Sequence, residues 1–216
     1  MTAPVTFVVP THPARGDADD PGSLLGMAVR SIFAQTLQPA GGISIMTDRD
    51  GDGAAVTRQR ALDTVKTEFV SFLDSDDWLY PHHLATHVRL LTGVTDPAID
   101  VLSIDPKYWA HDVAYSWWGG NRPFPESTHR GLVFNPATPH HITMTLTVRT
   151  ELAKAAGFDG RPLDPEWAGE DWKFILRLCE LGARFVGTGE ETWHYRVHGA
   201  NTSGLPHRGD GPMVTP

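Results

Sequence analysis

The chain has little cysteine, no long hydrophobic run and no basic signal segment, and each absence excludes a class of protein. Its single cysteine, Cys179, excludes an intramolecular disulfide framework and a metal site built on several cysteines. No apolar run approaches the roughly 18 residues that a spanning helix needs, so we expect no membrane span. The first residues lack the basic stretch of a signal peptide, and we therefore expect a cytoplasmic protein.

The charge balance of the chain is acidic. It has 26 acidic and 18 basic residues, a formal net charge of −8. Non-specific binding of nucleic acid needs a basic surface, so we expect no nucleic-acid partner. Hydrophobic residues make up 40% of the chain and charged residues 20%, which is typical of a folded soluble core. A length of 216 residues is enough for one ordinary domain.

The first third of the chain alternates between strand and helix patterns. Apolar runs at Val5–Val9, Ile43–Met46 and Phe69–Leu73 predict three strands. Between them, the spacing of apolar residues predicts a helix that begins after the N-cap Ser23 and a second helix over about Ala54–Val65. This order predicts an α/β protein with a mostly parallel central sheet that is flanked by helices.

The rest of the chain is less regular. We expect helices over Pro81–Leu91, Thr150–Ala156 and Glu170–Leu181, and strands at Val101–Ile104, Met144–Val148, around Phe185 and at Trp193–Arg196. Tyr108–Pro139 is expected to be a long irregular segment or to form short hairpins, and 204–216 a flexible tail. His83 and His87 lie four residues apart without a third metal ligand, which predicts surface positions. Cys179 lies beside core positions of its helix and is expected to pack there.

Three carboxylates follow the third strand directly, in the run Asp74-Ser75-Asp76-Asp77. This places them at the carboxyl edge of the sheet, where open α/β folds bind ligands. Carboxylates this close repel one another unless a cation lies among them, and Mg²⁺ or Mn²⁺ bridging to a phosphate is the natural occupant. The alternative is an Asp-rich turn that caps the next helix.

A second acidic loop, DRDGDG, begins with Asp48 at the end of the second strand. It resembles a calcium loop, but Gln59 stands at the twelfth position, where an EF-hand has glutamate. The alternative is a solvated turn. On the following helix, Arg58 or Arg60 could reach a diphosphate at the sheet edge, although ordinary exposed arginines would give the same pattern.

Two polar groups lie near the C-terminal end. Glu170 and Asp171 open a helix, where they either complement the helix dipole or include a general base. His194, Arg196 and His198 share one face of a predicted strand and could approach a metal or a phosphate. The alternative for these three residues is a half-exposed edge strand.

Five motifs in order resemble a family 2 glycosyltransferase of the GT-A fold. They span about residues 5–203 and are VVPTH with the helix end VRSIFAQTLQP, GAAVTRQRAL, FLDSDDWLYPHHL, AGEDWKFILRLCELGARF and YRVHGANTSG. The resemblance implies a single Rossmann-like domain over 1–203. Its nucleotide-sugar-binding half covers about 1–105, and its acceptor-side half covers about 106–203.

The resemblance also implies a role for individual residues. Contacts to a nucleotide-diphosphate sugar fall on Thr11, Asp48, Arg58, Asp74, Ser75 and Asp76. Asp76 would hold Mn²⁺ or Mg²⁺, with Asp74 and His198 as further metal candidates. Asp171 would be the catalytic base with Glu170 beside it, and Trp117 and Trp118 would contact an acceptor that the resemblance leaves unidentified. The expected reaction is a single displacement with inversion at the anomeric carbon.

The sequence departs from the family pattern at three places. Gln59 replaces the family's Asn after the arginine, and the loop Pro13–Gly22 is longer and more acidic than usual. The Q-x-x-R-W motif of processive synthases is absent, which favours transfer of one sugar at a time. Two alternatives remain open: a non-catalytic GT-A module that binds nucleotide or glycan, and a sugar-phosphate nucleotidyltransferase. The latter normally has a G-x-G-T-R loop, which this chain lacks.

Overall fold

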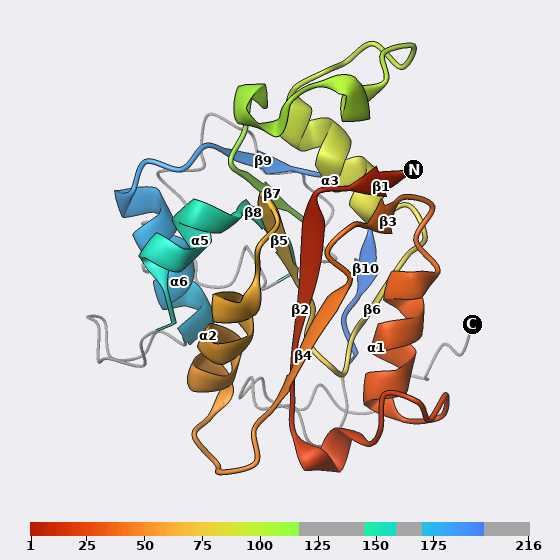
Figure 1. Ribbon diagram of the computed structural model, residues 1–216, viewed down its shortest axis with the longest axis vertical. Helices are drawn as coiled ribbons and strands as arrows, with labels where there is room; N and C mark the ends of the chain where they lie inside the picture. Colours follow the sequence, from red (N-terminus) through yellow and green to blue (C-terminus); the bar gives the residue numbers. More distant parts are fainter. Residues whose placement is uncertain (117–144, 159–169, 197–216) are drawn as a thin grey trace.

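A six-stranded sheet with helices on both faces forms the centre of the protein (Figure 1). The structure, a computed structural model, describes residues 1–116, 145–158 and 170–196. The sheet has the order β4-β2-β5-β8-β7-β9, with bounds Ile43–Thr47, Val5–Thr11, Phe69–Phe72, Leu146–Arg149, Val113–Tyr115 and Phe185–Gly187. The helices are α1 (Leu24–Phe33), α2 (Ala54–Thr64), α3 (His83–Thr92), α5 (Thr150–Ala156) and α6 (Glu170–Glu180).

Short elements complete the described chain. Two small sheets pair β1 (Thr2–Ala3) with β3 (Gln38–Pro39) and β6 (Trp78–Leu79) with β10 (Trp193–His194). Three 3₁₀ turns are η1 (Pro13–Arg15), η2 (Val101–Ser103) and η3 (Pro106–Tyr108). No helix in these described parts is both long and apolar enough to cross a bilayer.

The parallel half of the sheet confirms the expectation from the first third of the chain. β2 pairs in parallel with β4 on one side and with β5 on the other, and α1 and α2 connect these strands. β8 then runs antiparallel to both β5 and β7, and β7 is parallel to β9. The sheet is therefore parallel where the acidic motifs end their strands and mixed beyond β5.

Two apolar cores lie on opposite faces of the sheet because successive side chains of a strand point to opposite sides. Along β2, Val8 packs in the core beneath α2, α5 and α6, whereas Phe7 packs in the core beneath α1 and α3. In the first core, Phe174 of α6 stacks on Phe158 with ring centroids 4.2 Å apart and meets Phe72 of β5 edge-on at 5.6 Å. These rings fasten α6 to the strand that carries the acidic turn.

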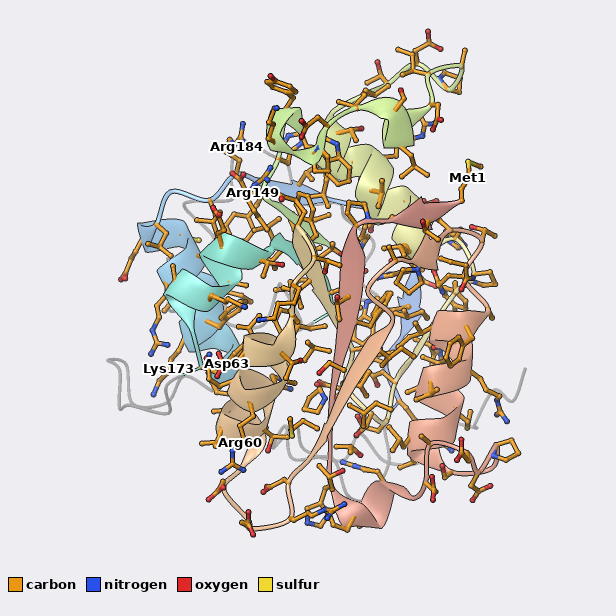
Figure 2. The ribbon with its side chains drawn as sticks, in the orientation of Figure 1. Met1, Arg60, Asp63, Arg149, Lys173 and Arg184 are labelled. Atoms are coloured by element: carbon orange, nitrogen blue, oxygen red, sulfur yellow. The ribbon has the colours of Figure 1, made fainter. Side chains whose placement is uncertain are left out.

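An ion-pair network closes the far end of the sheet. Asp112 accepts hydrogen bonds from Arg184 (Nε–Oδ2, 2.8 Å) and Arg149 (Nε–Oδ1, 3.3 Å), and Arg149 also pairs with Glu68. Figure 2 shows Arg149 and Arg184 beside each other at this end. Burial opposes the charge of Asp112, but the hydrogen bonds from Arg184 and the pairing with Arg149 lower its pKa. The network joins the start of β7 to the end of β8 and the start of β9.

Most expected elements are confirmed, and one is wrong. Ser23 caps α1, since its Oγ accepts the Gly26 N–H at 2.9 Å. The predicted strand at Val101–Ile104 is instead the 3₁₀ turn η2, because the Asp100 carboxylate accepts the Leu102 N–H and closes a turn there. β7 lies inside the segment that was expected to be irregular or to form short hairpins, and the remainder of that segment and the predicted tail lie largely or wholly outside the described residues.

His83 and His87 are not surface residues, which corrects the expectation from their spacing. Both side chains are fully buried between α3 and the sheet. His87 bonds to Thr147 (Nδ1–Oγ1, 2.8 Å) and to Ser116 (Nε2–Oγ, 2.9 Å), and His83 bonds to Thr192 (Nδ1–Oγ1, 3.0 Å). Hydroxyl groups directly after β7, on β8 and before β10 thus bond to both ring nitrogens of His87 and to Nδ1 of His83, whereas the buried Nε2 of His83 has no such partner among the described residues. Only the tertiary structure brings these groups together.

Burial makes this histidine pair sensitive to acid. Desolvation lowers the pKa of His87 to about 3 and lowers the pKa of His83 well below 6.5, where the neighbouring His87 adds to the effect. The unfolded chain takes up these protons below pH 6.5, whereas the folded protein does not. The stability that the neutral pair contributes is therefore complete above pH 6.5 and is lost as the pH falls toward 3.

We expect His87→Gln to flatten the loss of stability between pH 6.5 and 4, although the variant is less stable than wild type at pH 7.5. One such histidine contributes a slope of about 1.4 kcal/mol for each pH unit. Denaturant unfolding at a series of pH values measures the slope. His82→Gln, at an exposed position beside the same helix, is the control and should keep the wild-type slope. An equal slope for His87→Gln and wild type would contradict the assignment.

Candidate functional site

The carboxyl ends of β2, β4 and β5 lie together at one edge of the sheet, at the lower end of these strands in Figure 1. The Asp48 N–H donates to the carbonyl oxygen of Thr11 at 2.8 Å, so the first residue after β4 lies against the last residue of β2. The neighbouring strand β5 leads directly into Asp74. The structure thus brings together three segments that the sequence placed at one edge.

The Asp48 carboxylate is held by its own loop. Its Oδ1 accepts the Asp52 N–H and its Oδ2 accepts the Gly53 N–H, both at 2.9 Å. Gly51 and Gly53 have φ of 76° and 91°, a left-handed backbone that favours glycine and lets the loop turn back on Asp48. Hydrogen bonds, first of all from Gly53, lower the pKa of Asp48 and keep it ionised. The loop therefore presents a fixed acceptor group beside Thr11.

Arg58 lies beneath the edge and not on the surface. Its side chain is only 6% exposed, and it bonds Asp74 (Nη2–Oδ1, 2.6 Å) and Glu170 (Nη1–Oε1, 2.7 Å). Burial alone would lower the pKa of Arg58, but these two carboxylates outweigh it and raise the pKa above its ordinary value. By contrast, Arg60 projects outward from α2, 45% exposed, and pairs with Asp52 (Figure 2). The two arginines that the sequence left equivalent are thus distinguished by burial.

Each carboxyl group of the acidic turn has a different partner. Asp74 pairs with Arg58, and Asp76 pairs with Arg15 of η1 at 3.0 Å. Asp77 is buried and its Oδ1 accepts the Arg196 N–H at 2.9 Å. Sequence reasoning missed Arg15; the signal available was a single arginine in an otherwise acidic loop opposite an Asp-rich motif. These contacts reduce the repulsion that neighbouring carboxylates would otherwise exert.

One of these three carboxyl groups, that of Asp77, is protonated near neutral pH. Burial, reinforced by the charge of Asp74, raises the pKa of Asp77 to about 9. Its neutral form keeps the Arg196 hydrogen bond, which ties the chain after β10 to the acidic turn. Ser75 is also buried, 5% exposed. Asp74 and Asp76 are therefore the carboxylates of this turn that pair with arginine side chains.

The donor set of the turn fits a divalent cation. No group of three or more His, Cys, Asp or Glu side chains suited to a metal occurs within residues 1–116, 145–158 and 170–196. Mg²⁺, however, is commonly bound through one or two carboxylates, with phosphate oxygens and water completing its shell. Asp74 and Asp76 supply hard oxygen ligands of that kind, and His198 lies outside the described residues.

The remaining predicted residues divide between the site and the undescribed segments. Glu170 and Asp171 begin α6, as expected, and Glu170 reaches the edge through Arg58. His194 stacks on Trp78 across the β6–β10 pair, with centroids 4.0 Å apart. Within the described residues β10 pairs with β6 alone, and His194 and Arg196 are partly exposed, in agreement with the alternative of a half-exposed edge strand. Trp117 and Trp118 lie outside the described residues.

Comparison by sequence finds no family profile and no curated protein that matches this chain. Comparison of structures does find matches. S. aureus TarS 1-349 in complex with UDP-GlcNAc is 18% identical with a TM-score of 0.56, over 91% of this chain and 58% of that one. The mannosyltransferase PcManGT from Pyrobaculum calidifontis, solved with GDP-Man and Mn²⁺, is 16% identical with a TM-score of 0.50, over 87% and 55%.

This chain has the GT-A fold of glycosyltransferases. The shared architecture is the mixed α/β sheet with helices on both faces, and it confirms the fold that the motifs predicted. The chain spans less than two thirds of the length of these TarS and PcManGT chains. The likeness therefore establishes the fold and leaves substrates and chemistry to the site itself.

The raised pKa of Asp77 predicts a stability change at alkaline pH. The folded state holds this proton up to about pH 9, whereas the unfolded chain releases it near 3.8. The stability from this group is complete below 3.8 and declines as the pH rises toward 9. Asp77→Asn keeps an oxygen acceptor without the charge, so it should be about 1–3 kcal/mol more stable than wild type at pH 8.

Denaturant unfolding at pH 4.5 and pH 8 measures this difference, which should shrink at the lower pH. Asp63→Asn, on the exposed side of α2 (Figure 2), is the matched control and should change stability equally little at both pH values. An Asp77→Asn variant that is less stable than wild type at pH 8 would show that Asp77 is ionised in the folded protein.

Proposed function

We propose that this protein is a metal-dependent, inverting glycosyltransferase that moves one sugar from a nucleotide-diphosphate sugar to an acceptor hydroxyl. One observation carries the proposal: at the carboxyl edge of a GT-A sheet, Arg58 joins the acidic turn after β5 to the carboxylates that open α6. A donor-side acid cluster and a candidate base thus face one edge. TarS solved with UDP-GlcNAc and PcManGT with GDP-Man and Mn²⁺ support a nucleotide-sugar donor.

The donor would lie along the ends of β2, β4 and β5. We assign Asp48 to the nucleotide base, because its ionised carboxylate is fixed beside Thr11 by the loop that follows it. Asp74 and Ser75 are assigned to the ribose or sugar. Asp76, with Asp74 and His198 as further ligands, would hold Mn²⁺ or Mg²⁺, which when bound neutralises charge on the departing diphosphate.

Asp171 is assigned as the general base, with Glu170 beside it. Asp171 begins α6 and is half-buried. It would take the proton of the acceptor hydroxyl while the acceptor oxygen bonds to the anomeric carbon and the bond from that carbon to the diphosphate oxygen breaks. Attack from the side opposite the diphosphate inverts the anomeric carbon, so no carboxylate nucleophile is needed. Trp117 and Trp118 remain the predicted acceptor contacts.

A non-catalytic GT-A module is the second candidate. It would use the same edge to bind nucleotide or glycan and would not need a base at the start of α6. The presence of both Asp76 and Asp171 favours the enzyme, because binding alone uses only the first of them. The two candidates differ in turnover and not in nucleotide binding, so the tests below separate them.

Nucleotide binding is tested by thermal unfolding with UDP, GDP, dTDP and CMP, each with Mn²⁺ or with EDTA. A ligand at about 100 times its Kd adds roughly 2.7 kcal/mol of stability. We expect one nucleotide to raise the Tm only with Mn²⁺, and Asp76→Ala to abolish that rise. Asp105→Ala should keep it, because Asp105 precedes Pro106, whose carbonyl bonds to Arg149 at the far end of the sheet. A rise that persists in EDTA would contradict the metal role of Asp76.

The base is tested with Asp171→Asn in a transfer assay with the nucleotide sugar so identified. Removing a general base typically costs about 10²–10⁴-fold in rate, and we expect a loss of that size with nucleotide affinity unchanged within about twofold. Glu180→Gln, exposed at the end of the same helix, should transfer at the wild-type rate. Normal transfer by Asp171→Asn would eliminate Asp171 as the base, and a wild type that binds nucleotide without turnover would support the non-catalytic module.

A further inference from the structure

We propose that Arg58 is a positioning residue: its guanidinium fixes the first turn of α6, and with it Asp171, against the acidic turn that follows β5. This inference rests on the proposed function, in which Asp171 is the base and the acidic turn belongs to the donor site. It differs from the expectation that Arg58 contacts the donor.

The geometry of the guanidinium is that of a bridge. Its two terminal nitrogens bond to carboxylates on different elements, Asp74 after β5 and Glu170 at the start of α6, at 2.6 and 2.7 Å. These partners are 16 and 112 residues away along the chain. A planar guanidinium sets the direction of both bonds at once, so it restricts how α6 can move relative to β5.

The depth of the guanidinium distinguishes positioning from donor binding. The side chain of Arg58 is 6% exposed, whereas those of Asp74 and Glu170 are each 37% exposed. The cation thus lies inward of both carboxylates, which stand between it and solvent on the open side of the edge. A donor that reached the edge would meet these carboxylates before it met the arginine.

The charge of Arg58 acts on the base as well as on its direct partners. Asp171 lies close enough for its carboxylate to contribute to the raised pKa of Arg58, and by reciprocity the arginine favours the ionised form of Asp171. A general base must be ionised before it can take a proton. Arg58 also bonds to Asp74 and Glu170, so the charges of these two carboxylates belong to the same bridge.

The chain offers a matched control in Arg60. It lies on the same helix and also makes an ion pair, with Asp52 at 2.6 Å, but its side chain is 45% exposed. Exposed pairs of this kind contribute little because solvent screens them. Comparing Arg58 with Arg60 therefore compares a buried bridge with a surface ion pair in the same helical setting.

The first test is the pH dependence of transfer by Arg58→Gln. We expect kcat to fall about tenfold or more with KM for the nucleotide sugar changed less than about twofold, because the base is displaced while the donor contacts remain. The acid limb of the kcat profile should move to higher pH, because the substitution removes the positive charge that acts on Asp171.

Two further variants separate charge from geometry. Arg58→Lys keeps the charge but cannot bridge two carboxylates, so its acid limb should stay near that of wild type while kcat is still reduced. Arg60→Gln should match wild type in kcat and in the position of the limb. A rise in KM alone for Arg58→Gln would make Arg58 a donor contact. If Arg58→Gln lowered both kcat and Tm and left the acid limb of the kcat profile where it is in wild type, the role of Arg58 would be purely structural.

The second test needs no turnover. Hydrogen exchange is measured at the amides of Phe174 and Ile175, whose partners in an α-helix are the carbonyls four residues earlier. Arg58→Gln should speed their exchange about tenfold, with the amides of β5 unchanged and Arg60→Gln equal to wild type. If Arg58→Gln does not fold, the same hydrogen-exchange measurement is made on Arg58→Lys. Unchanged exchange would overturn the positioning role, whereas a wild type without transfer would overturn only the proposed function.

Discussion

The parallel pairing of β2 with both β4 and β5 is the constraint on which the rest of the site depends. Parallel strands joined by helices have their carboxyl ends at the same edge of the sheet. The loop that follows each strand therefore begins at that edge. Thr11, Asp48 and Asp74 reach one place for this reason, although they lie far apart in the sequence. Beyond β5 the sheet continues through β8, which is antiparallel to β5, and then through β7 and β9, which run in the same direction as β5.

Several carboxyl groups can lie this close together at one edge of the sheet only because other groups offset their charge. Arg58 neutralises Asp74 and Glu170 from below, Arg15 pairs with Asp76, and burial keeps Asp77 protonated. The opposite end of the sheet uses the same chemistry for a structural purpose, since Arg149 and Arg184 enclose Asp112 there. The two ends differ in what remains open: the carboxylates of Asp74 and Glu170 are partly exposed, whereas Asp112 is nearly covered.

The C-terminal half of the described chain is attached to this edge through buried polar contacts. His83 and His87 bond to hydroxyl groups directly after β7, on β8 and before β10, and Asp77 bonds to the backbone after β10. Each of these contacts joins a segment of the C-terminal half to α3 or to the turn that precedes it. The acidic edge and the strands of the later half are thus held in one arrangement by groups that carry no charge at neutral pH.

The sequence by itself determined the fold class and the place of the acidic motifs. Strand and helix periods, Ser23 as a cap and the run from Asp74 to Asp77 are local signals that need no distant partner to be recognised. It did not distinguish Arg58 from Arg60, or reveal the burial of His83, because those properties depend on which distant groups pack against each side chain. The 3₁₀ turn at Val101 was not predicted, because the short apolar run there indicated a strand. The Asp100 carboxylate instead accepts the Leu102 N–H and stabilises a turn. Only the tertiary structure decided these partners, since the energy of a buried polar group depends on neighbours that sequence spacing does not specify.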